Sequence, residues 1–235
     1  AAIAAAQIMN YHRWPEYGSG SISYSCTVFD NTTATIEADF ENYTYDWDNI
    51  MTTHLAPYST LQAQATAQLV YHVGAAARMQ YVSYWSLTDT HSIYEALLNN
   101  FGYSKAMRVH NRMNYSSQTW EALIRNELDN SRPVFYSGYG GTSVSSTYNA
   151  FVVDGYNANG YFHVNWGVGE YSNGFFLLHA LNYPVGNYNQ YDQGYNYRQQ
   201  IITGICPDDG TTQTENYVEM SYEHLSSPVP QVELG

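Results

Sequence analysis

The stretch NAFVVDGY (149–156), followed after three residues by GYFHVNWG (160–167), decides the architecture of the second half of the chain. Both segments are short and apolar or alternating, and Gly, Asn and Asp separate them, which predicts two antiparallel strands joined as a hairpin. An Asn-Trp pair, Asn165 and Trp166, stands at the end of the second segment. By spacing alone, an ordinary hairpin with a buried tryptophan is favoured over a catalytic arrangement.

Segments of the same kind continue on both sides of this hairpin, and helical patterns precede them. Strands are predicted over 133–141, 173–181 and 199–206. Helices are predicted over 1–12, 59–78, 91–101 and 117–130. The first helix is alanine-rich and apolar almost all round, so we expect it to be buried. The fold class is therefore α+β, with the helical part first and an antiparallel sheet second.

Composition excludes several classes of protein. The 235 residues include 8 Lys+Arg and 21 Asp+Glu, for a net charge of −13. Charged residues make up 12% and aromatic residues 16%, including 25 tyrosines, which is the reverse of a disordered chain. The negative charge argues against nucleic acid as a partner. Because there is no run of 18 apolar residues, we also expect no membrane span.

The two ends of the chain carry separate predictions. We expect one domain over 1–207, and a linker or the start of a following segment over 208–235, where the composition shifts after Pro207. A buried helix that starts at residue 1 would leave its first N–H groups without a cap. We therefore expect that further sequence precedes Ala1.

Eight segments taken together resemble one known family. The chain is similar to the streptopain family (peptidase family C10) of secreted bacterial cysteine peptidases over about residues 1–207. The matching segments, in order, are AQIMNYHRWP (6–15), YDWDNI (45–50), NNFGY (99–103), WEALIRNEL (120–128), RPVFYSGYG (132–140), AFVVDGY (150–156), FHVNWGVG (162–169) and NGFFLLHALN (173–182). The resemblance implies a papain-like fold and an endopeptidase made as a zymogen. In such sites a Cys attacks the peptide, a His is the base, and an Asn orients the His.

The chain departs from the family where the chemistry should occur. The family's nucleophilic Cys lies seven residues before the position of Gln7, which places it immediately before Ala1. The family's His falls at Asn149, and the Gln that helps form its oxyanion hole falls at Ser137. The Asn-Trp pair survives as Asn165 and Trp166. A second family tryptophan is replaced by Val168.

These departures predict a catalytically degenerate member. Asparagine cannot take a proton from a thiol, so Asn149 removes the general base. Ser137 shortens the oxyanion donor, and the loss of one such donor typically costs about 10²–10³ in rate. The primary hypothesis is a secreted or cell-surface bacterial pseudo-peptidase that binds or scaffolds a protein or peptide. Its active-site-equivalent positions are Asn149, Asn165, Trp166 and Ser137.

Two alternatives remain open on the sequence alone. One is an active cysteine endopeptidase whose nucleophile lies just before Ala1. The other is a glycan-binding or adhesin module that uses the Tyr-rich loop 183–197, because tyrosines stack on sugars and pack on partners.

The remaining histidines and cysteines indicate no further site. His163 shares a strand face with Asn165, and we interpret it as a structural histidine. Cys26 and Cys206 could form a disulfide in a secreted protein, but two buried thiols are the favoured interpretation. No H-x-x-x-H pattern or Cys/His cluster exists, so we expect neither a metal nor another cofactor.

Overall fold

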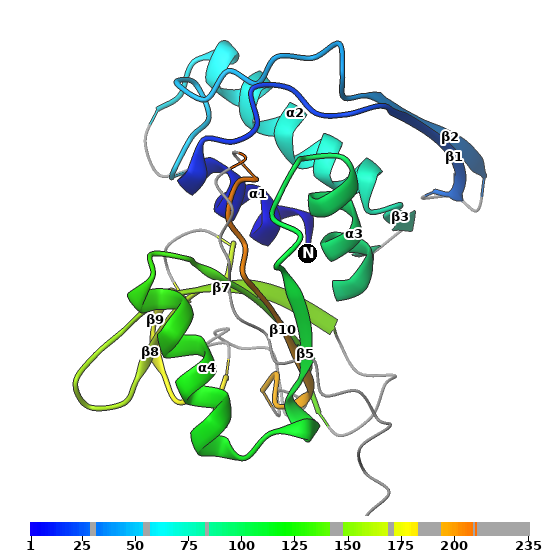
Figure 1. Ribbon diagram of the computed structural model, residues 1–235. Coiled ribbons are helices and arrows are strands. Elements are labelled where there is room, and N and C mark those ends of the chain that lie inside the picture. Colours follow the sequence, from blue (N-terminus) through cyan, green and yellow to red (C-terminus); the bar gives the residue numbers. More distant parts are fainter. Residues whose placement is uncertain are drawn as a thin grey trace, which may run out of the picture.

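The chain folds into a helical half and a sheet half, which lie one above the other in Figure 1. The computed structural model describes residues 1–28, 32–53, 57–82, 85–141, 148–168, 172–182, 194–208 and 210. The helical half contains α1 (Ala2–His12), α2 (Thr60–Ala76) and α3 (Thr90–Asn99), and the sheet half carries α4 (Ser117–Asp129). The predicted α+β class is confirmed.

A six-stranded antiparallel sheet forms the lower half, with the strand order β5-β10-β6-β7-β8-β9. Strands β6 and β7 are neighbours at its centre, and β10 returns from the end of the chain to lie between β5 and β6. The strands are β5 (Arg108–Asn111), β6 (Val134–Tyr139), β7 (Tyr148–Tyr156), β8 (Phe162–Asn165), β9 (Gly174–Phe176) and β10 (Tyr197–Thr203).

Side-chain caps explain where three of the helices begin. Ser59 accepts from the backbone N–H of Gln62, whose own side chain bonds back to Ser59, forming a capping box at α2. Asp89 and Ser116 cap α3 and α4 more simply, because each accepts one backbone N–H without the reciprocal bond. These caps satisfy backbone donors that have no partner within the helix, and they agree with the predicted helix starts to within about one residue.

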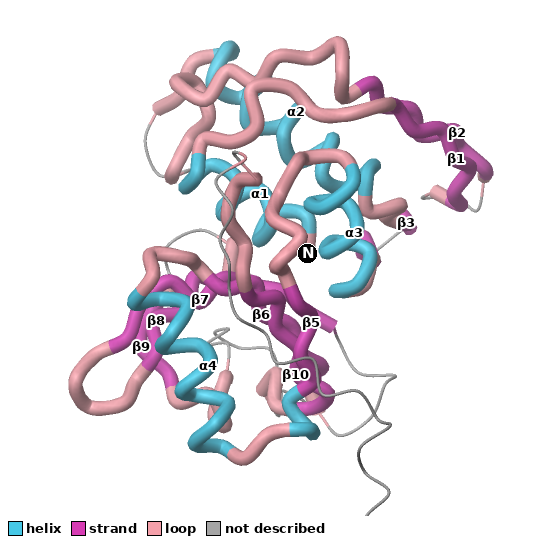
Figure 2. The backbone as a smooth tube through the Cα atoms, in the orientation of Figure 1, coloured by secondary structure: helices cyan, strands magenta, loops and turns pink. Residues whose placement is uncertain are grey.

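Two hydrophobic cores lie on opposite faces of the sheet. The first core joins α1, α2 and α3 to Phe135, Ala150 and Val152. The second core contains Phe151, Val153 and Trp120, and α4 covers it (Figure 2). Residues 150, 151, 152 and 153 thus alternate between the two cores, as expected for a strand that is buried on both faces. Helix α1 is buried along most of its length, as predicted, and it packs on β7 and β6.

Three features were not predicted from the sequence. Strand β5 lies between α3 and α4 and forms one edge of the sheet, so the chain does not divide strictly into helices first and strands second. Strands β3 (Gln80–Val82) and β4 (Trp85–Leu87) form a small hairpin in the helical half. The predicted strand 173–181 is reduced to β9, because Leu177–Ala180 closes a turn instead. A second hairpin, formed by β1 (Ser21–Thr27) and β2 (Thr33–Asp39), also belongs to the helical half.

Candidate active site

Three neighbouring strands bring the predicted site residues together. Ser137 lies on β6, Asn149 on β7 and Asn165 at the end of β8. Ser137 pairs with Ala150, Gly138 pairs with Asn149, and Val152 pairs with Asn165 across the strands. Ser137 and Asn149 thus stand one register position apart, whereas Asn165 lies opposite a residue three positions further along β7. Helix α1 packs on both β6 and β7.

The side chain of Asn165 joins the sheet to α1. Its Oδ1 accepts from Gln7 Nε2 at 3.1 Å and from the backbone N–H of Gly167 at 3.0 Å. Gly167 has a positive φ of 73°, and a Cβ there would lie 3.1 Å from Ile3 of α1, so glycine permits this close approach. Gln7 helped only to align the chain with the family motif, and its contact with Asn165 was not predicted from the sequence. Gln7 is one of the few polar residues on the mostly buried helix α1, and such a side chain indicates that a hydrogen-bond partner lies nearby.

Trp166 belongs to the core of the sheet half. Its ring is buried and lies 4.6 Å from the ring of Phe151, between centroids, and 5.4 Å from that of Phe176. Its backbone N–H donates to Asn173 Oδ1 at 3.0 Å. The expectation of a hairpin with a buried tryptophan is confirmed.

Asn149 has a local hydrogen bond instead of a long-range one. Its Oδ1 accepts from the backbone N–H of the next residue, Ala150, at 2.9 Å, and the side chain is half-buried. The position that the resemblance assigns to the catalytic histidine therefore holds an amide that is directed towards its own strand. An amide at this place can donate and accept hydrogen bonds but cannot act as a base near neutral pH.

Ser137 is fully buried and bonds across the two halves of the protein. Its hydroxyl lies 2.7 Å from the hydroxyl of Thr90, the first residue of α3, and Thr90 Oγ1 lies 3.2 Å from the phenol oxygen of Tyr148 on β7. Burial raises the pKa of the Tyr148 phenol above its usual value, so that this group stays neutral. These three residues form a hydroxyl cluster, in which the parts played by Thr90 and Tyr148 were not predicted from the sequence.

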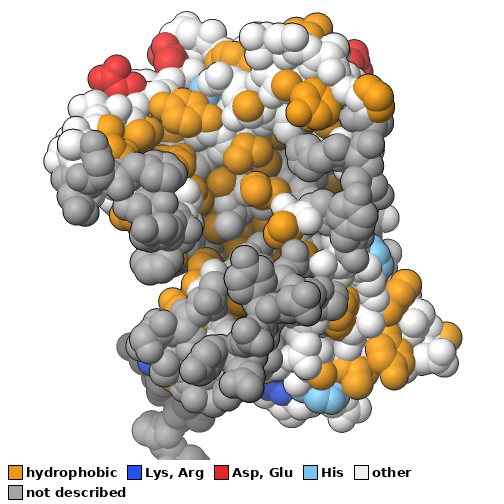
Figure 3. Space-filling model, turned by 180° about the vertical axis from the view of Figure 1, so that it is seen from behind, with side chains coloured by type: hydrophobic (Ala, Val, Ile, Leu, Met, Phe, Trp, Pro, Cys, Tyr) orange, Lys and Arg blue, Asp and Glu red, His pale blue; other side chains and the backbone are white. Residues whose placement is uncertain are grey.

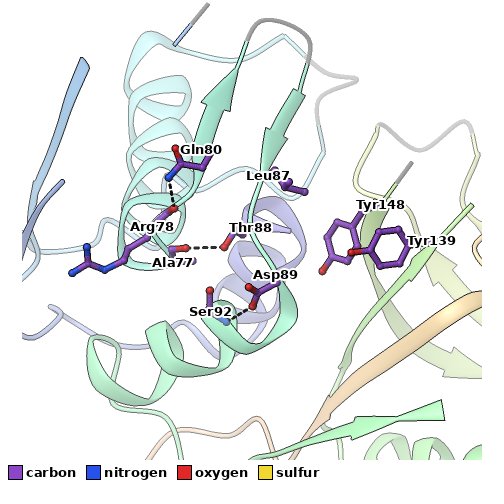
Figure 4. A pocket seen from close by; sticks show the side chains of 9 residues that line it. All are labelled: Ala77, Arg78, Gln80, Leu87, Thr88, Asp89, Ser92, Tyr139 and Tyr148. Carbon is purple, nitrogen blue, oxygen red and sulfur yellow. Dashed lines mark hydrogen bonds between the residues drawn. The ribbon is translucent and has the colours of Figure 1, made fainter. Parts of the chain in front are cut away.

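A pocket lies beside the hydroxyl cluster, between the helical half and the ends of β6 and β7. Its volume is about 250 Å³. The residues that line it are Ala77, Arg78, Gln80, Leu87, Thr88, Asp89, Ser92, Tyr139 and Tyr148 (Figure 4). Viewed from behind, hydrophobic side chains gather in a hollow between the two halves of the molecule (Figure 3). The junction of the two halves thus offers an apolar surface and a pocket lined by both polar and apolar side chains.

Four of the described histidines, His12, His72, His110 and His163, have hydrogen-bond partners of their own. His163 Nδ1 bonds to Asp154 Oδ1 at 2.5 Å, and its ring contacts Phe175, in agreement with a structural role. His72 lies between the phenol oxygen of Tyr45, at 2.9 Å, and Gln68, and burial lowers its pKa to about 4. Burial also lowers the pKa of His12 and of His110. His54 and His224 lie outside the described residues.

The other expectations can be compared with the described part of the chain. Cys26 and Cys206 are not joined by a disulfide. Cys26 is buried as expected, whereas Cys206 is only partly buried. No group of three or more metal-ligating side chains occurs among the described residues. Within the same residues, no helix has both the length and the apolar character that a membrane crossing requires. Most of the Tyr-rich loop 183–197 and nearly all of 208–235 lie outside the described residues, while Tyr195 packs against Trp166 in the core.

Comparison with known proteins decides the family. The sequence pattern of the Peptidase C10 family matches residues 1–176. The chain belongs to the Peptidase C10 family. Streptopain of Streptococcus pyogenes is 34% identical over 209 residues, which cover 88% of this chain and 52% of streptopain. The thiol protease/hemagglutinin PrtT of Porphyromonas gingivalis is also 34% identical, over 88% of this chain and 23% of that protein. This Peptidase C10 chain thus spans about half the length of the streptopains it matches.

A solved structure confirms the fold of this Peptidase C10 member. The active wild-type interpain A cysteine protease of Prevotella intermedia superposes with a TM-score of 0.78 at 31% identity. The match covers 87% of this chain and 81% of interpain A. A fragment of prointerpain A that carries a cysteine-to-alanine mutation superposes with a TM-score of 0.70 over 62% of its length. The fold is therefore papain-like, as the resemblance implied.

Proposed function

We propose that this chain is a non-catalytic member of the Peptidase C10 family that binds or scaffolds a protein or peptide. One observation carries the proposal: the base position holds Asn149, whose side-chain oxygen accepts from the N–H of Ala150. A cysteine thiol needs a base or an imidazolium partner to become a thiolate at neutral pH. With an amide at this position, the family's cysteine would remain a poorly reactive thiol.

The contacts of Ser137 support the same proposal. Its hydroxyl is fully buried and engaged with Thr90 at 2.7 Å, so it is held away from any substrate carbonyl. An oxyanion donor acts only when it points at the position where negative charge develops. Two of the positions that the family uses for chemistry thus carry groups committed to internal hydrogen bonds.

The scaffold around these positions is retained, which supports a binding role. Asn165 still joins β8 to α1, and Trp166 is still packed in the core. The junction of the two halves, which Ser137 bridges through Thr90, presents a pocket of about 250 Å³ in which a peptide side chain could be held. We place this domain over residues 1–207, outside the bacterial cell or on its surface, with 208–235 as a linker or the start of a following segment.

The test uses the natural full-length protein and measures cleavage of casein and labelling by a thiol-directed epoxide inhibitor. The residue before Ala1 is first determined from the gene. We expect no cleavage and no labelling even if that residue is cysteine, because no base is present at position 149.

The matched variant restores the family's chemical groups. If cysteine precedes Ala1, Asn149→His combined with Ser137→Gln should give cleavage at least about 10²-fold above the natural protein, since general base catalysis contributes about 10²–10⁴. If another residue precedes Ala1, cysteine is introduced there as well. Efficient cleavage by the unaltered protein would show that it is an active endopeptidase and overturn the proposal.

A further inference from the structure

The pocket beside the hydroxyl cluster has an aromatic wall on the sheet side. Tyr139 and Tyr148 are direct partners across β6 and β7, and their rings lie 5.2 Å apart between centroids with an angle of 60°. The Tyr148 phenol is held by Thr90, so this ring is fixed in place. Figure 4 shows both tyrosines on one side of the pocket, across from Leu87, whose side chain is 48% exposed. A planar group could therefore enter between an aliphatic and an aromatic surface.

The charge next to the aromatic wall is negative. Of the nine lining residues, Asp89 is the only carboxylate and Arg78 the only cation. Arg78 extends away from the tyrosines in Figure 4, and its guanidinium lies 6.0 Å from the centre of the Tyr24 ring. Asp89 is exposed, and beyond the larger effect of burial its charge also raises the pKa of the Tyr148 phenol. The charge that a ligand at the tyrosines would meet is thus that of Asp89.

One oxygen of Asp89 remains available for a ligand. Its Oδ1 accepts from the backbone N–H of Ser92 at 2.8 Å and caps α3. The other oxygen makes no hydrogen bond with another described residue. The positive end of the α3 dipole reduces the attraction of this carboxylate for a cation but typically by only about 0.3–1 kcal/mol. A carboxylate beside two tyrosine rings remains suited to a cation, which is attracted by the charge and by the ring faces.

We propose that this pocket binds the guanidinium group of an arginine side chain in a peptide or protein partner. The guanidinium is planar, stacks on aromatic rings and donates hydrogen bonds to carboxylates, so it matches Tyr139, Tyr148 and Asp89 together. The inference deepens the proposed function and rests on it, because it assigns a ligand group to the junction where we place peptide binding.

The experiment compares two small probes that differ in charge and hardly in shape. N-acetyl-arginine amide carries the guanidinium, and N-acetyl-citrulline amide replaces it by a neutral urea. Binding to the full-length protein is measured by NMR titration or calorimetry at low salt. We expect arginine amide to bind at least about 10-fold more tightly, with a preference that weakens as salt screens the charge. Equal affinities for the two probes would overturn the inference.

Variants test the charge of Asp89 and the aromatic wall separately. Asp89→Asn removes the charge while retaining a good helix cap, since Asn and Asp cap helices about equally well. We expect this variant to lose the preference for arginine while its thermal melting stays close to that of the unaltered protein. Tyr139→Leu should weaken binding of both probes. Glu41→Gln, an exposed acid in the β2–α2 connection, is the matched control and should change neither affinity. An unchanged arginine preference in Asp89→Asn would contradict the inference.

The readout also separates this inference from the proposed function. The binding assay contains no peptide to cleave, and the casein assay contains no requirement for arginine. If the protein cleaves casein but binds arginine amide selectively, the proposed function fails and the pocket assignment stands. If neither cleavage nor selective binding occurs, only the pocket assignment fails.

Discussion

Asn165 and Asn149 carry the same side chain on neighbouring strands, yet the structure uses them differently. Asn165 Oδ1 accepts from Gln7, 158 positions away in the sequence, and so joins the helical half to the sheet. Asn149 Oδ1 accepts from the N–H of the next residue. The Asn165 amide helps to hold the helical half against the sheet, whereas the Asn149 amide contacts only its own strand.

This difference distinguishes the framework of the site, meaning the residues that hold the two halves together, from the positions that the family uses for catalysis. The end of β8 carries Asn165 and Trp166, at positions where the resemblance predicts the family's own residues, and it is bound to α1 and into the core. Ser137 on β6 and Asn149 on β7 stand at positions where we propose a departure from the family, and both side chains make internal contacts. On the proposed function, the fold persists without its catalytic groups, because packing and buried hydrogen bonds supply its stability.

The largest contrast is expected between the two positions of the family's tryptophans. Trp166→Ala should lower the free energy of unfolding by about 3–5 kcal/mol, since it empties a buried site between Phe151 and Phe176. Val168→Ala should change it by no more than about 0.5 kcal/mol, because Val168 is 60% exposed. Urea unfolding followed by circular dichroism measures both. Similar losses in the two variants would show that both positions belong to the framework.

The two asparagines provide the next contrast. Asn165→Ala should cost about 1–3 kcal/mol, because it leaves Gln7 Nε2 and the Gly167 N–H without their acceptor in a partly buried place. Asn149→Ala should cost about 0.5 kcal/mol or less, since it removes only a local bond. The same unfolding experiment applies. A larger loss for Asn149→Ala would reverse the contrast between the two amides.

The pH dependence of stability should arise in the helical half and not in the site. Burial lowers the pKa of His72 from 6.5 to about 4 in the folded protein. Between these values the unfolded chain binds more protons, so His72 stabilises the fold fully above pH 6.5 and this contribution is lost as the pH falls towards 4. The protonation of His72 in the unfolded chain should therefore lower the free energy of unfolding by about 1 kcal/mol between about pH 7 and about pH 5.5.

Variants identify the residue responsible for that loss. His72→Gln should flatten the decline between about pH 7 and about pH 5.5, whereas Asn149→Ala and Asn165→Ala should leave its slope unchanged because neither residue titrates. Thermal melting in matched buffers across this range is the measurement. A decline that persists in His72→Gln would assign the effect to other groups, with His12 and His110 as the next candidates.

The smallest effect concerns the hydroxyl cluster. In a double-mutant cycle, Ser137→Ala and Thr90→Val should show a coupling of about 0.5–1.5 kcal/mol, the usual net value of one hydrogen bond. Thermal or urea unfolding of the single and double variants gives this value. A coupling energy near zero would mean that the Ser137 hydroxyl is not held by Thr90 of α3. It would contradict the proposal that this hydroxyl is occupied by an internal hydrogen bond.

Much of the fold could be predicted from local patterns. The capping residues Ser59 and Ser116 mark helix starts, and the alternation in 149–156 marks β7, because both depend on residues close in sequence. Strand β5 was missed because Arg108–Asn111 has a weak pattern, being only partly buried at the edge of the sheet. It becomes a strand through pairing with β10, which comes much later in the chain.

Residue identity and order are enough to establish the family, the fold class and the chemical groups at positions 137, 149, 165 and 166. The contacts of those groups depend on the folded molecule, which places Gln7 against Asn165, Thr90 against Ser137, and two tyrosines beside Asp89. Such contacts join residues that are far apart in the chain, and their geometry is set by the packing of α1 and α3 on the sheet. No local pattern encodes that packing, which is why these long-range partners could be found only in three dimensions.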